Sequence, residues 1–125
     1  MSHFTDVDIQ VRDLDALQAA CQELDLGFET DTQARGYAHN STHGDYVIKL
    51  KGPYDIAVNR QAGGNMTLTA DLWCGHVERE VGTSFGRLKQ LYGVHLATRE
   101  ARRRGLHVQR QHLADGRIRL QLQQV

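Results

Sequence analysis

The residues of this chain that could bind a metal ion are its seven histidines and two cysteines. His39 and His43 lie four residues apart, and Cys74 and His76 offer a thiol and an imidazole separated by one glycine. A zinc site needs three or four converging ligands of these types. The segment around these two histidines, residues 39–44, is polar and contains a glycine, so we expect both histidines on a loop. The sequence therefore predicts no metal site, with His39, His43, Cys74 and His76 as weak candidates. A small metal-dependent enzyme is the least favoured alternative.

A cysteine beside a histidine could act as a nucleophile, because the imidazole can take the thiol proton. Cys74 has no glycine loop nearby that could stabilise an oxyanion, and it follows Trp73, which we expect to be buried. The Gly63-Gly64 pair lacks the lysine and hydroxyl residue of a phosphate-binding loop. The sequence thus predicts no catalytic residue and no cofactor. It leaves enzymatic activity open and favours a non-enzymatic role.

A second kind of chemistry, nucleic-acid binding, would use the arginines of the last quarter of the chain. The candidates are Arg102, Arg103, Arg104, Arg110, Arg117 and Arg119. Single-stranded nucleic acid also calls for stacking aromatic side chains, and none follows Tyr92. A solvated helix end and a polar sheet face account for the same arginines, so nucleic acid remains the second interpretation.

Charge and composition limit the class of protein. The chain has 125 residues, 40% of them hydrophobic and 24% charged, which fits one globular domain over residues 1–125. Its net charge is zero, but residues 1–60 carry ten acidic and five basic side chains and residues 61–125 carry the reverse. This split favours either close mixing of the two halves in the fold or head-to-tail assembly.

No apolar run is long enough to span a membrane, and no export signal is visible. We therefore expect a cytoplasmic protein whose cysteines are unpaired and buried.

Apolar spacing predicts the elements that position these residues. Residues 4–11 alternate as a strand, and Asp13 is placed to cap a helix that ends near Gly27. Strands are expected at 46–50, 54–58 and 66–73, the last two joined at 63–65. Segment 84–104, capped by Thr83 or Ser84, is expected to be helical, and the pattern does not decide between one helix and two.

The last expected element is a hairpin whose turn is Asp115-Gly116. Together these elements indicate an α+β fold: one curved, mostly antiparallel sheet with two helical regions on one face. The order of elements is also compatible with a duplicated β-α-β-β unit.

Four short motifs resemble a known family, the hypothetical chloroplast reading-frame thirty-five family. They are Met1-Ser2-His3-Phe4, Arg35-Gly36-Tyr37, Gly52-Pro53-Tyr54-Asp55-Ile56 and Ala70-Asp71-Leu72-Trp73. The resemblance covers essentially the whole chain and departs where Cys74 separates Trp73 from Gly75. It implies membership of a domain family of unknown function found in cyanobacteria, algal plastids, other bacteria and phages. It supplies no catalytic residues, and it implies a role in a protein complex with association to an AAA-type ATPase.

The motifs single out five residues as candidates for partner binding: Arg35, Tyr37, Tyr54, Asp71 and Trp73. Core packing is the favoured explanation for their aromatic members. Asp71 is out of phase with the apolar positions of its strand, so it should face away from the main core, where it could pair with Arg35. We therefore expect an interaction or adaptor protein in a cytoplasmic complex that binds a protein partner or itself. The open sheet face and the edge strands, especially the last hairpin, are the expected contact surfaces.

Overall fold

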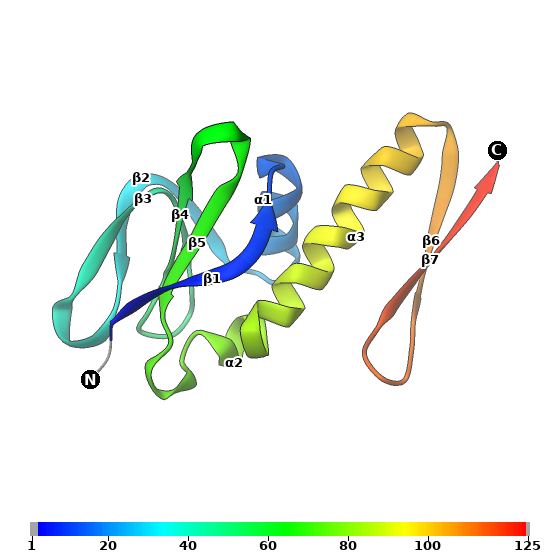
Figure 1. Ribbon diagram of the computed structural model, residues 1–125. Coiled ribbons are helices and arrows are strands. Elements are labelled where there is room, and N and C mark those ends of the chain that lie inside the picture. The colour runs from blue at the N-terminus through cyan, green and yellow to red at the C-terminus, as the bar shows by residue number, and fades with distance from the viewer. Residues whose placement is uncertain (1–2, 125) are drawn as a thin grey trace.

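The computed structural model describes residues 3–124 of the chain (Figure 1). Two longer helices, one short helix and seven strands follow one another along these residues. In chain order they are β1 (Phe4–Val11), α1 (Leu14–Glu23), β2 (Gly27–Arg35), β3 (Ser41–Lys49), β4 (Ile56–Arg60), β5 (Met66–Asp71), α2 (Glu78–Val81), α3 (Gly86–Arg103), β6 (Leu106–His112) and β7 (Ile118–Gln124).

The main sheet is antiparallel and has five strands in the order β1-β5-β4-β3-β2. The alternate residues Ile48, Ile56, Val58 and Leu68 are fully buried on one face, in the same core cluster as apolar residues of α1 and α3. Both longer helices therefore cover the same face, which confirms the predicted α+β class and its layer order. In the described part of the chain, no helix is long and apolar enough to span a membrane.

The last hairpin differs from the expectation of one sheet. β6 and β7 pair only with each other in a separate two-stranded sheet, which lies beyond α3 from the main sheet (Figure 1). The expected succession of elements is present as β1-α1-β2-β3 and β5-α3-β6-β7. In three dimensions the two sets differ, because β2 and β3 join the sheet of β1 whereas β6 and β7 do not join the sheet of β5.

The ends of the two longer helices test the predicted capping residues. The Asp13 carboxylate accepts the Ala16 backbone N–H at 2.9 Å, so the predicted cap of α1 is confirmed. The region 84–104 is one helix, because α3 continues without a break through Gly93. The predicted Thr83 or Ser84 cap of that helix is wrong: Phe85 takes the cap position in the left-handed region, and the Ser84 N–H donates to Glu78 at 2.7 Å.

The long β2–β3 hairpin folds over the sheet face opposite the helices. Val47 and Ala57 point to this face, since they are out of phase with the helix-facing residues, and Ala34 of β2 is buried against them. Gly44 makes this close packing possible, because a Cβ there would lie 2.4 Å from the Tyr46 carbonyl oxygen and 3.3 Å from the Cα atom of Ala57. The fold brings the end of β2 across to β4 and β5.

Candidate functional site

The Arg35 guanidinium and the Asp55 carboxylate form an ion pair where β2 ends and β4 begins. Asp55 is fully buried, and Arg35 donates to it through Nε at 2.8 Å, Nη2 at 2.8 Å and its backbone N–H at 3.0 Å. The Leu50 N–H donates to the same carboxylate at 3.2 Å, and the Asp55 N–H returns a bond to the Arg35 carbonyl at 3.0 Å. The bidentate pair fixes the end of β2 beside the 50–55 loop.

A second buried carboxylate, Asp71, holds two turns of the chain together. Its Oδ2 accepts the Tyr37 backbone N–H at 3.0 Å, and its Oδ1 accepts the Trp73 backbone N–H at 3.0 Å. Tyr37 begins the short 3-10 turn after β2, and Trp73 begins the one after β5. Asp71 faces away from the helix-covered core, as the alternation of its strand predicted. The predicted pairing with Arg35 is replaced by the ion pair of Arg35 with Asp55.

The two turns present an exposed aromatic pair, which we call the Tyr37–Trp73 surface. The Tyr37 side chain is 45% exposed and that of Trp73 is 44% exposed. Their rings meet edge to face, with centroids 5.8 Å apart. The expectation that Trp73 is buried is therefore wrong, because the strand alternation ends at Asp71 and the tryptophan belongs to the turn that follows. Cys74, in the same turn, is exposed, whereas Cys21 is buried, so the expectation of buried thiols holds for Cys21 alone.

Two further rings, those of the buried Tyr54 and the half-buried Phe4, lie next to this surface. Tyr54 is buried, as the packing interpretation predicted, and its ring meets the His76 imidazole edge to face at 4.9 Å. Phe4 lies against Gly36, where a Cβ atom would come within 2.6 Å of the phenyl ring and 3.3 Å of the Asp71 carboxylate. Glycine at position 36 therefore lets the turn close on Phe4 and Asp71, and a larger residue would displace the phenyl ring.

The loop between β3 and β4 is held by Glu80. Its two carboxylate oxygens accept the backbone N–H groups of Lys51 at 2.7 Å and Gly52 at 2.9 Å. The Gly52 carbonyl in turn accepts Arg35 Nη2 at 2.9 Å. Segments from the four motifs thus meet at one place: Phe4, the turn at Arg35 to Tyr37, the 52–56 segment and the end of β5. Residues 1 and 2 of the first motif lie outside the described residues.

The electrostatics of the site favour fixed ion pairs over proton transfer. Burial alone would raise the pKa of the Asp55 carboxyl, but the hydrogen bonds from Arg35 and the Leu50 N–H outweigh burial, and the pKa lies below its usual value of 3.8. The hydrogen bond to Asp55 raises the pKa of Arg35. Burial, with a smaller contribution from Asp71, raises the pKa of the Tyr54 phenol. A carboxylate this well paired and a permanently charged guanidinium suit positioning of the backbone.

The weak metal candidates are dispersed in the structure. Among residues 3–124, no three His, Cys, Asp or Glu side chains come together in a way that could hold a metal ion. His43 Nε2 lies 2.6 Å from the exposed Asp31 carboxylate, whereas His76 packs on Tyr54. His39 lies in the 3-10 turn after β2, and Cys74 is exposed in the turn after β5.

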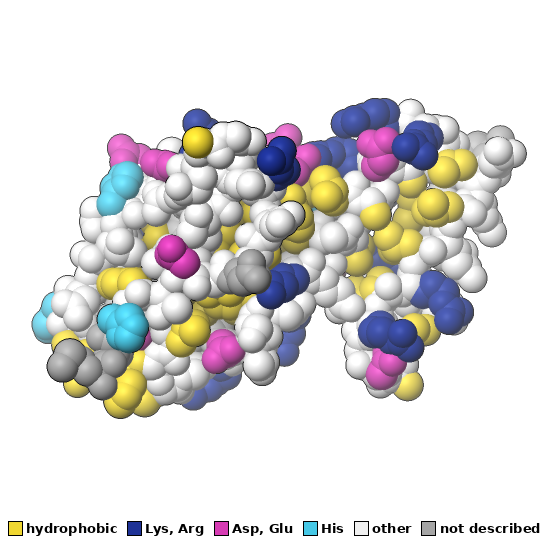
Figure 2. All heavy atoms as spheres, in the orientation of Figure 1, with side chains coloured by type: hydrophobic (Ala, Val, Ile, Leu, Met, Phe, Trp, Pro, Cys, Tyr) yellow, Lys and Arg dark blue, Asp and Glu magenta, His cyan; other side chains and the backbone are white. Residues whose placement is uncertain are grey.

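Most of the candidate arginines for nucleic acid bind carboxylates of the same molecule. Arg110 makes a bidentate contact with Glu23 of α1 at 2.9 and 3.1 Å, and Arg103 and Arg104 bind Glu100. Arg117 pairs with Asp115 at 2.7 Å, and Arg119 contacts Gln111 at 3.5 Å. Arg102 is exposed on α3. In the view of Figure 2, acidic side chains lie among the basic ones over the hairpin and the end of α3. Four of the six candidate arginines are thus paired with acidic side chains of the same chain.

The charge split along the sequence serves packing between the two halves. Glu23 of α1 binds Arg110 of β6 and His95 of α3, and Arg99 of α3 binds Asp13 and Asp15 at the start of α1. The hydrogen bond from Arg110 lowers the pKa of Glu23. Acidic groups of the first half and basic groups of the second half therefore meet across the α1–α3 contact, as the mixing interpretation predicted.

Three residues that matter at the site were not among the predicted ones. They are Asp55, Glu80 and Gly36, which respectively anchor Arg35, hold the 51–52 backbone and allow the close approach of Phe4. Asp55 stands immediately before the apolar run of β4, where an acidic residue in a buried strand signals a specific partner. No comparable pattern marks Glu80, whose target lies 28 residues away along the chain.

Comparison with known proteins gives one match. The model of a family described as a protein of unknown function, DUF1257, matches residues 20–121. No curated protein and no solved structure matches the chain.

Proposed function

This chain belongs to the family of proteins of unknown function DUF1257, and we propose that it is a non-enzymatic adaptor that binds a protein partner through the Tyr37–Trp73 surface. The observation that carries the proposal is that Asp71 accepts hydrogen bonds from the backbones of both Tyr37 and Trp73. One buried carboxylate fixes the backbones of both exposed aromatic residues. Binding at this surface costs less conformational entropy, because the backbone that carries the two rings is already fixed before the partner arrives.

Aromatic anchors of this kind supply much of the binding energy in protein interfaces, where tryptophan and tyrosine are enriched. Two large rings that remain nearly half exposed are costly to keep in water unless another surface covers them. Two buried carboxylates, Asp55 and Asp71, and the buried Tyr54 stabilise the backbone beneath the two rings. A rigid support of this kind favours binding at the surface above it.

The finer resemblance to the hypothetical chloroplast reading-frame thirty-five family adds a candidate for the partner. We infer that the complex is cytoplasmic and includes an AAA-type ATPase. We also infer that the protein self-associates through its C-terminal hairpin. Leu122 on β7 is 53% exposed, and hydrophobic side chains show at the surface of this hairpin in Figure 2. Two-stranded sheets are marginal on their own and gain stability when another surface covers them.

The test is affinity purification of tagged protein from its host, followed by mass spectrometry. Wild-type protein is compared with Trp73→Ser and, as a matched control, Leu96→Ser, which removes an exposed apolar side chain of α3 outside both proposed surfaces. Trp73→Ser leaves the backbone N–H that Asp71 binds, so the fold is retained. We expect the main partner to be captured by wild type and the control and lost from Trp73→Ser. Equal capture by all three proteins refutes the proposal.

A further inference from the structure

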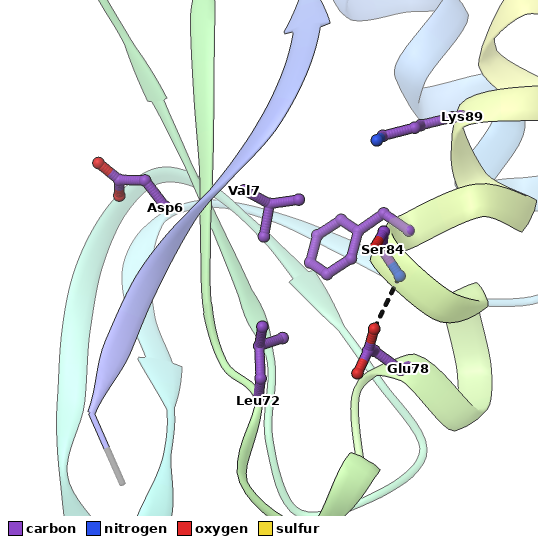
Figure 3. A pocket seen from close by; sticks show the side chains of 7 residues that line it. Asp6, Val7, Leu72, Glu78, Ser84 and Lys89 are labelled. Carbon is purple, nitrogen blue, oxygen red and sulfur yellow. Dashed lines mark hydrogen bonds between the residues drawn. The ribbon is translucent and has the colours of Figure 1, made fainter.

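A groove runs between the outer edge of β1 and the first half of α3. It consists of two cavities of about 340 and 310 Å³ that share Lys89. The first reaches from Leu72 past Val7 to Lys89, and the second continues along Ile9 to Tyr92. We call this surface the β1–α3 groove, and Figure 3 shows its first cavity. Neither Tyr37 nor Trp73 lines it.

One wall of the groove is an edge strand. β1 is the first strand in the order of the main sheet, and among the described residues no strand pairs with its outer side. An unpaired edge presents backbone N–H and C=O groups that another extended segment can bind. The stretch of β1 that lines the groove, from Asp6 to Gln10, is long enough to pair with a peptide of about five residues at about 3.3 Å per residue.

The other wall is helical and its floor is apolar. Phe85 is fully buried in the main core, and Val7 packs against the same core. Ile9, further along β1, is half-buried against the same core. The Tyr92 hydroxyl accepts the backbone N–H groups of Arg12 and Asp13, each at 3.1 Å, and so closes the far end by tying β1 to α3.

Lys89 is a basic side chain of the groove that has no partner in the described chain. It is half-buried at the junction of the two cavities, and within the described chain it has no hydrogen bond or ion pair. The acidic residues of the first cavity already accept hydrogen bonds within the chain. Glu78 accepts the Ser84 N–H at 2.7 Å, and Asp6 accepts the Thr69 hydroxyl at 2.6 Å. Figure 3 shows the Asp6 carboxylate on the opposite side of β1 from Val7. Among the charged side chains that line the two cavities, Lys89 is thus the one without a hydrogen bond or ion pair in the described chain, and its ammonium group can bind a carboxylate.

We propose that the β1–α3 groove binds an extended acidic peptide segment of a partner protein, which adds to the main sheet as a sixth strand beside β1. Side chains of a strand face one side at every second residue. An Asp or Glu of the peptide meets Lys89, and aliphatic residues two positions before and after it fill the two cavities. The combination of strand pairing and pockets for alternate side chains is one of the recurrent modes of peptide recognition.

The test is selection from phage-displayed random heptapeptides on the immobilised full-length chain, followed by fluorescence anisotropy with the most enriched peptide. We expect enriched sequences to share an acidic residue with aliphatic residues two positions on either side. Lys89→Glu should weaken binding at least about tenfold, the scale of a close, partly desolvated charge pair. A peptide with lysine in place of its acidic residue should recover binding to Lys89→Glu. Arg102→Glu, an exposed change on the same helix, is the control and should leave the affinity within about twofold.

Two further variants keep the result interpretable. Lys89→Met retains the apolar stem of the side chain, so a loss of binding shared with Lys89→Glu reports the charge and not a folding defect. Trp73→Ser should leave peptide binding unchanged, which separates this proposal from the one for the Tyr37–Trp73 surface. Failure to enrich any peptide, enrichment without acidic residues, or an affinity indifferent to Lys89→Glu overturns the proposal. So does a dimer in light scattering that Lys89→Glu dissociates, because the occupant is then a second copy of the chain.

Discussion

Replacement of Asp71 by asparagine tests the network under the Tyr37–Trp73 surface. The carboxylate accepts the backbone N–H of Tyr37 with one oxygen and that of Trp73 with the other, both at 3.0 Å. An amide keeps one acceptor oxygen and turns an NH₂ group toward the second N–H. Asp71→Asn therefore loses one hydrogen bond to a charged group and leaves a buried donor unpaired.

The expected cost follows from the size of such a bond. A hydrogen bond to a charged group contributes about 1.5–3 kcal/mol, and an unsatisfied buried donor costs a similar amount when its partner is removed. We expect Asp71→Asn to lower the free energy of unfolding by about 1.5–3 kcal/mol. For a domain with a total of about 5–15 kcal/mol this is a large change.

Urea unfolding followed by circular dichroism measures this cost, with Glu29→Gln as the control because Glu29 is exposed on β2. The chain has one tryptophan, so acrylamide quenching of its fluorescence reports directly on the turn at Trp73 and should increase in Asp71→Asn. A loss below about 0.5 kcal/mol, the range of ordinary surface changes, together with unchanged quenching refutes the positioning role of Asp71.

Three further predictions concern the fold around the site. Gly44→Ala should lower the free energy of unfolding by about 1–3 kcal/mol, because its Cβ would meet the Tyr46 carbonyl oxygen. In the same denaturant titrations, Gly93→Ala on the open face of α3 should instead add about 1 kcal/mol, and similar effects of the two changes would contradict the packing of the β2–β3 hairpin. The pKa of Asp55 is lowered in the folded chain, so its stabilisation is complete above its usual value of 3.8 and is lost as the pH falls through the lowered value. Unfolding measured from pH 7 to pH 2 should show a steeper acid loss in wild type than in Asp55→Asn, and identical pH profiles would exclude this linkage. Burial raises the pKa of Cys21 to about 12, so a thiol reagent at pH 8 should titrate only Cys74 in the native protein and both cysteines in urea; rapid modification of both in the native state would show that the core is open.

Local signals in the sequence predicted β1, α1, β4, β5 and the last hairpin, but they gave no bounds for β2 and placed the start of β3 at Tyr46 instead of Ser41. The capping carboxylate of Asp13 and the apolar spacing after it fix α1, since both act within one or two helical turns. The alternation in β5 placed Asp71 on the face away from the helices for the same reason. These features depend on neighbours along the chain, and a single sequence is enough to find them.

Contacts between residues far apart in the chain could not be predicted from the local sequence pattern. The choice of Asp55 over Asp71 as the partner of Arg35 depends on how the β2–β3 hairpin folds across the sheet, which Gly44 and the small side chains beside it permit. The separate hairpin of β6 and β7 has a normal strand pattern, and nothing in that pattern states which sheet it joins. The segments of the four motifs meet at the candidate site, but the motifs did not give its geometry.

The most direct test of the adaptor proposal is photo-crosslinking in the host from within the Tyr37–Trp73 surface. Tyr37→p-benzoylphenylalanine keeps an aromatic ring at the exposed position, and the same probe at Gln61, in the exposed turn at the other end of β5, is the control. The proposal predicts a discrete crosslinked protein from position 37 that is absent from position 61 and disappears when Trp73→Ser is added. No adduct at position 37, or the same adducts from both positions, contradicts it.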